Sequence, residues 1–161
     1  MRRAIACLAL AACGGSDPGP PCQEASDRAV DLVPADVEWG AFNDGDDLPY
    51  GNPPQGGAPY SPFRVRVGGL ARLSESAHVT LSATDQADGT PLGDIAYDMR
   101  FTCANVGDSA GMWMAPDVHL RFEGKTLDDL AGRQAEVTVE VIDPDGDHVD
   151  TAIVGQLVLM E

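Results

Sequence analysis

The chain has 161 residues, and its 26 Asp and Glu against 10 Lys and Arg give a formal net charge of −16 at pH 7. So acidic a chain is not expected to bind nucleic acid, because that affinity comes mainly from cationic side chains that neutralise phosphates. The length suffices for one ordinary domain with a hydrophobic core.

Residues 1–12 have the features of a secretory signal peptide. Arg2 and Arg3 precede an apolar run, residues 4–12, that is far shorter than the roughly 20 residues of a transmembrane helix. The run ends in Leu-Ala-Ala-Cys at residues 10–13, which resembles the lipobox of bacterial lipoproteins. This resemblance implies cleavage before Cys13 and lipid on its thiol, so that the protein is anchored to a membrane without spanning it.

The residue after the lipidated cysteine bears on location. By resemblance to enterobacterial lipoproteins, where Asp at that position retains the protein at the inner membrane, Gly14 implies an outer-membrane lipoprotein of the cell envelope. Gly and Pro dominate the following residues, so we expect residues 13–21 to form a lipidated tether and residues 22–161 to form the folded domain.

The four cysteines sort by position. Cys7 lies in the signal and Cys13 takes the lipid, so Cys22 and Cys103 remain in an oxidising compartment where disulfides persist. We therefore predict a Cys22–Cys103 disulfide that ties the N-terminal edge of the domain to a central strand.

Strand patterns dominate the rest of the chain. Alternation of apolar and polar residues predicts half-buried strands at residues 63–67, 78–83, 118–122 and 135–141. Further strands are expected around residues 37–42, 95–103 and 148–159. Residues 126–130 predict one short helix, with Thr126 as its N-cap.

The number and spacing of these elements indicate a fold class. About seven strands with turns between them and no long helix predict an all-β antiparallel sandwich. From roughly residue 34 to residue 160 the chain resembles an immunoglobulin-like domain, although the Cys…Trp…Cys pattern of antibody domains is absent.

The most distinctive segment is residues 44–70, with a DGD turn and a Gln-Gly-Gly loop. It resembles a segment of uncharacterised envelope lipoproteins from GC-rich Gram-negative bacteria, a likeness that transfers no activity. Four prolines stiffen its residues 52–62. Two interpretations stay open: Tyr50 and Tyr60 belong to an aromatic recognition loop, or their rings pack inward beneath a structural crossover.

Three further aspartates suggest a weak cation site. Asp143, Asp145 and Asp147 resemble a calcium loop, since calcium prefers clustered carboxylates and carbonyls. Their spacing does not match an EF-hand, and a solvated hairpin turn is the alternative. Residues 43–47 (NDGDD) would supply a second site if folding brought the two loops together.

Two tryptophans are the remaining candidates, and the sequence contains no motif for zinc binding or for a serine hydrolase. Trp113 is either an interface anchor or part of the core, and Trp39 is expected in the core. The three histidines match no zinc motif, and there is no GxSxG elbow.

Three functions follow from these patterns. We first expect a non-enzymatic binding or structural module of the envelope, with an envelope protein or polysaccharide as its partner and no cofactor. The alternatives are a calcium-dependent adhesion module and an enzyme of unknown class.

Overall fold

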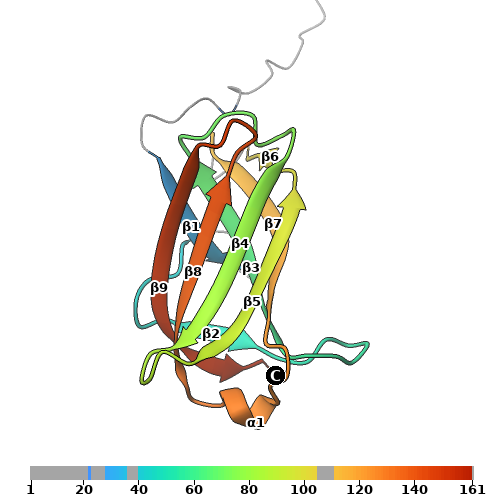
Figure 1. Cartoon of the computed structure of the whole chain (residues 1–161), viewed down its shortest axis with the longest axis vertical. Helices are drawn as coiled ribbons and strands as arrows, with labels where there is room; N and C mark the ends of the chain where they lie inside the picture. Colours follow the sequence, from blue (N-terminus) through green and yellow to red (C-terminus); the bar gives the residue numbers. More distant parts are fainter. Residues whose placement is uncertain (1–21, 23–27, 36–39, 105–110, 161) are drawn as a thin grey trace, which may run out of the picture.

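A computed structural model describes residues 22, 28–35, 40–104 and 111–160. The expected signal peptide, Cys13, the tether and Trp39 lie outside these residues. Within them the chain forms two β-sheets that face each other and a single short helix (Figure 1). No helix in this part of the chain is long and apolar enough to cross a membrane.

The first sheet has four strands. In spatial order they are β1 (Ala29–Pro34), β3 (Tyr60–Gly68), β7 (Trp113–Arg121) and β6 (Thr102–Cys103). The second sheet has five, and their order is β2 (Asp47–Tyr50), β9 (His148–Leu159), β8 (Gln134–Ile142), β4 (Ala77–Asp85) and β5 (Pro91–Met99).

The core lies between the sheets and follows directly from the alternating sequence. In β8, the four buried residues are Ala135, Val137, Val139 and Val141, whereas Glu136 and the other intervening residues face outward. The same pattern in β3, β4, β7 and β9 confirms the strands predicted there. The all-β sandwich is therefore confirmed.

Several elements differ from the prediction. The described chain has nine strands rather than about seven. β1 and β2 were not expected, and the single strand expected at residues 95–103 is divided into β5 and β6. β2 pairs in parallel with β9, so the second sheet is mixed rather than antiparallel throughout. In the region expected to form a strand at residues 37–42, the described residues 40–42 are irregular.

The segment at residues 95–103 is not one strand but a crossover between the sheets. β5 ends at Met99, and the buried Phe101 follows, with its N–H donating to the carbonyl of Leu73 at 2.9 Å. Cys103 then lies in β6, at the edge of the first sheet. The predicted Cys22–Cys103 disulfide is present, but it joins the N-terminal side of the domain to an edge strand and not to a central one.

The sandwich has two distinct ends, and β7 runs from one to the other. At the disulfide end, Cys103 pairs with Trp113 at the start of β7. At the opposite end, Arg121, the last residue of β7, pairs with Tyr60. Eight residue steps at about 3.3 Å each separate these ends by about 26 Å. The helix α1 (Leu127–Leu130) and the loop before β3 lie at the lower end in Figure 1, and β6 lies at the upper end.

Candidate functional site

The loop between β2 and β3 projects from the lower end of the sandwich and is closed at its base. Gly51 and Tyr60 exchange two backbone hydrogen bonds of 3.0 and 2.9 Å, which bring the two ends of the loop together. One residue further on, the buried hydroxyl of Ser61 donates to the carbonyl of Pro49 at 2.7 Å. The loop is therefore fixed by three hydrogen bonds at its base.

The tip of the loop is a tight turn. The N–H of Gly56 donates to the carbonyl of Pro53 at 2.8 Å, which closes a four-residue turn. Pro54 occupies the second position of that turn, where its fixed φ is favourable. Gly57 follows with φ of 124°, a value that favours glycine. The hydrogen bond of this turn closes the tip of the loop.

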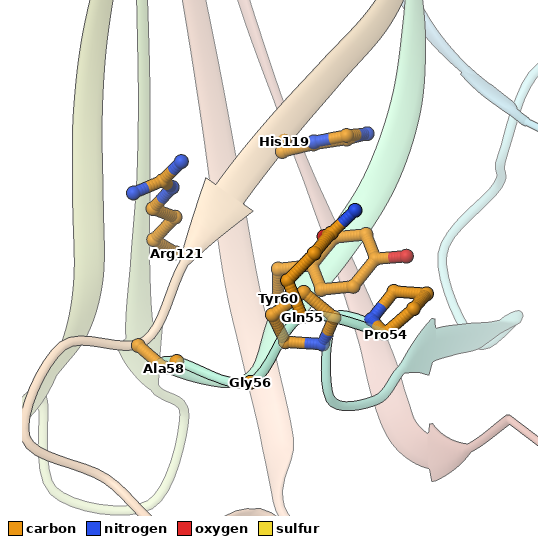
Figure 2. A pocket seen from close by; sticks show the side chains of 9 residues that line it. Pro54, Gln55, Gly56, Ala58, Tyr60, His119 and Arg121 are labelled. Carbon is orange, nitrogen blue, oxygen red and sulfur yellow. The ribbon is translucent and has the colours of Figure 1, made fainter.

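A cleft of about 260 Å³ lies between this loop and the outer face of the first sheet (Figure 2). From the sheet it receives Tyr60 on β3 and His119 and Arg121 on β7. The remaining lining residues come from the loop: Pro53, Pro54, Gln55, Gly56, Gly57 and Ala58.

Two rings form the wall of the cleft on the sheet side. The centroids of Tyr60 and His119 are 4.8 Å apart, and their planes are inclined by 55°. The backbone under His119 is held from the second sheet, because the hydroxyl of Tyr97 donates to the His119 carbonyl at 2.7 Å. These contacts fix the position of the wall before any ligand binds.

The cleft differs in charge from the chain as a whole. None of the described residues that line it is acidic, although the chain carries 26 Asp and Glu. Arg121 supplies a permanent positive charge, and Gln55 supplies an amide that both donates and accepts. The cleft thus combines an aromatic surface with hydrogen-bond donors and one cation.

Tyr60 takes part in this cleft, but Tyr50 does not. The side chain of Tyr50 is only 1% exposed, and its hydroxyl donates to the carbonyl of Leu127 at 3.1 Å. Of the two interpretations of Tyr50, these contacts fit the inward-packed ring and not a ring exposed for recognition: Tyr50 is a core residue that connects β2 to α1. Burial raises the pKa of its hydroxyl, and the nearby carboxylate of Asp128 raises it further.

Trp113 lies at the disulfide end, far from Tyr60. Its half-buried ring packs against the core, and its indole N–H donates to the carbonyl of Leu70 at 3.1 Å. The interpretation of Trp113 as an exposed interface anchor does not fit these contacts. The structure does not bring Tyr50, Tyr60 and Trp113 together into one site.

The three aspartates of the weak cation site bind protein groups instead. Asp143 is 5% exposed and accepts the backbone N–H groups of Asp145 and Asp147 at 2.9 and 3.0 Å. Arg72 binds Asp145 at 2.8 Å, and Arg28 binds Asp147 at 3.1 Å. In the part of the chain that the structure describes, no cluster of three such ligands could hold a metal ion. The predicted calcium site is therefore replaced by a turn with its own polar contacts.

The second acidic segment lies elsewhere. Asp44 accepts the N–H of Val154 at 2.9 Å, in the middle of β9. Asp143, by contrast, precedes the start of that strand. Six residue steps separate His148 from Val154, about 20 Å along an extended strand, so the two acidic loops do not form a joint site.

Sequence reasoning missed His119 and Arg121 as partners of Tyr60. The alternation of apolar and polar residues in this strand predicts that both side chains face outward, so this part of the site could be predicted from the sequence. Their position opposite Tyr60 depends on the β3–β7 register, which contains a bulge between Phe63 and Val65. No local pattern specifies that pairing.

Comparison with known proteins adds no assignment. Neither a protein-family model nor a curated protein matches this chain. The function has to be inferred from the site itself.

Proposed function

We propose that this protein is an envelope lipoprotein, anchored through lipid on Cys13, whose β-sandwich binds the end of a polysaccharide in the Tyr60 cleft. The role is one of binding rather than catalysis. The observation that carries the proposal is the preformed cleft, with a half-buried aromatic ring beside an amide and a guanidinium group.

The chemistry of a sugar suits these groups. A pyranose ring has C–H groups that pack on an aromatic ring and hydroxyls that bond to amides and guanidinium groups. The volume, about 260 Å³, is just below the range of about 300–1,000 Å³ that is usual for drug-sized ligands. It fits one sugar ring better than a long segment.

The hydrogen-bonded base of the loop supports binding as well. A ligand that must first order a loop loses part of its binding free energy to that ordering. Here the hydrogen bonds between Gly51 and Tyr60, and from Ser61 to Pro49, hold the loop in place without a ligand.

The position of the cleft fits a membrane-tethered module. Cys22 is bonded to β6 at the end of the sandwich opposite the cleft. If lipid on Cys13 anchors the chain, the tether joins the domain at that end. The cleft then faces away from the membrane, toward the polymers of the envelope.

Binding is tested with a glycan array that carries neutral and acidic oligosaccharides, probed with the full chain in detergent. We expect binding that Tyr60→Ala reduces at least tenfold, because the ring wall of the cleft is lost. The matched control is His148→Ala, which removes an exposed ring from the other sheet. Equal loss in both variants, or none in Tyr60→Ala, contradicts the proposal.

Anchoring is tested separately by expression of Cys13→Ser in a Gram-negative host. The unaltered chain should fractionate with membranes and incorporate labelled palmitate, whereas the variant should do neither. Continued palmitate labelling of Cys13→Ser would show that the lipidation site is wrong.

A further inference from the structure

One arginine that lines the cleft has no acidic partner among the described residues. Arg28, Arg66, Arg72 and Arg133 each form a salt bridge with an aspartate or glutamate. Arg100 forms none but donates to the backbone carbonyl of Glu75 at 3.0 Å. Arg121 forms none with the described part of the chain, although the sequence holds 26 acids. Its guanidinium is exposed and lines the cleft. A cation with no acidic partner among the described residues is suited to bind a negative group from outside.

The backbone of Arg121 is closely held. The β3–β7 ladder places it opposite Tyr60, and the Cα of Gly93 on β5 lies so near its carbonyl oxygen that a side chain at Gly93 would overlap that atom. The start of the Arg121 side chain is thus fixed on the strand next to Tyr60. In Figure 2 its guanidinium group stands apart from the Tyr60 ring, on the other side of the view.

The geometry points to the chemical class of the ligand: we propose that the cleft selects an acidic sugar at the end of a glycan chain, with Arg121 binding its carboxylate. Arg presents parallel N–H donors that match the two oxygens of a carboxylate. Tyr60 supplies the surface for the ring of the same sugar, and Gln55 supplies an amide for its hydroxyls. This inference rests on the proposed polysaccharide-binding function.

The charge of the remaining molecule favours a chain end. A net charge of −16 repels a long polyanion laid across the surface. A single terminal carboxylate in the cleft meets Arg121 and no lining acid. The acidic surface therefore repels an extended polyanion, whereas the cleft can bind the terminal residue of an acidic glycan.

Two trisaccharides test the inference, one ending in glucuronate and the other in glucose, so that they differ only in the carboxylate. Calorimetric titration of the full chain in detergent should give at least about tenfold tighter binding of the acidic probe, as expected for a charge-assisted bidentate pair. Arg121→Gln should bind both probes with nearly equal affinity.

The control variant is Arg28→Gln, which removes the same charge from the disulfide end, where Arg28 is exposed and pairs with Asp147. It should keep the preference for the acidic probe. Equal binding of both probes by the unaltered chain, with loss in Tyr60→Ala, would overturn the inference and leave the polysaccharide-binding function standing. Binding of neither probe would overturn both.

Discussion

Tyr50 shows how one side chain of an unusual loop segment became part of the core. Its hydroxyl reaches α1 and donates a hydrogen bond to the carbonyl of Leu127, the first residue of that helix. The pKa of the hydroxyl is raised by burial and by the Asp128 carboxylate. The folded protein therefore holds this proton more tightly than the unfolded chain does.

This difference predicts a pH dependence. Above about pH 10 the unfolded chain releases the Tyr50 proton more readily than the folded protein, so the free energy of unfolding should fall as the pH rises. In Tyr50→Phe the contribution of this proton to the alkaline decrease should be absent. At neutral pH the free energy of unfolding of this variant should be lower by about 1 kcal/mol, because the hydrogen bond is lost. Urea unfolding at about pH 7 and about pH 10.5 measures both effects; the same alkaline fall in both proteins would contradict the assignment.

The Asp143 carboxylate predicts the response to calcium. Its oxygen already accepts two backbone N–H groups, and arginines bind Asp145 and Asp147. A ligand that binds only the folded state raises the melting temperature. We expect no rise when EDTA is replaced by millimolar calcium. A clear increase, lost in Asp145→Asn, would restore the calcium-dependent adhesion hypothesis.

At the level of elements, the approach of β5 to β7 depends on Gly93. A Cβ at this position would overlap the backbone of Arg121 and press against Phe122. Gly93→Ala should lower the free energy of unfolding by about 1–3 kcal/mol, as overpacking does, and weaken binding in the cleft by moving Arg121.

The matched control is Ala96→Ser on the same strand, because Ala96 is exposed and faces solvent. Denaturant unfolding and glycan binding of both variants make the comparison. Gly93→Ala with the stability and affinity of the unaltered chain would show that β5 does not position the cleft.

The elements that could be predicted are those with an intact local pattern. Alternation in residues 135–141 and the turn at residues 143–146 specify β8 and its hairpin without any knowledge of the neighbours. Thr126 caps α1 as its sequence indicates, with the reciprocal bond to Asp129 present.

The elements that were missed depend on distant partners. β2 is a four-residue strand containing a proline, and it is defined by its parallel pairing with β9. The break at Phe101 depends on the Leu73 carbonyl, which no local pattern reveals. For the same reason the sequence could identify Tyr60 and Gln55 as unusual, but not the wall of His119 and Arg121 beside them.

At the scale of the whole molecule, the disulfide joins the N-terminal side of the domain to the sandwich across a sequence separation of 81 residues. Closing so long a loop restricts the unfolded chain, and loss of such a bond typically costs about 2–5 kcal/mol. The double variant Cys22→Ser/Cys103→Ser should lose stability in this range.

The cleft should be unaffected where the double variant is folded, because β7 separates it from the disulfide by about 26 Å. Chemical unfolding and glycan titration at low temperature measure the two properties independently. Unchanged stability would mean that the bond contributes nothing to the fold, and lost binding would mean that the two ends are coupled.

We propose that lipid on Cys13 anchors the protein and that the cleft at the end of the sandwich opposite the disulfide binds a glycan. Flotation of lipidated protein in liposomes, with a fluorescent trisaccharide ending in glucuronate, tests both at once. The unaltered chain should carry the sugar to the top of the gradient, Cys13→Ser should leave both at the bottom, and Tyr60→Ala should float without the sugar. Sugar that floats with Tyr60→Ala, or protein that floats with Cys13→Ser, would contradict the account.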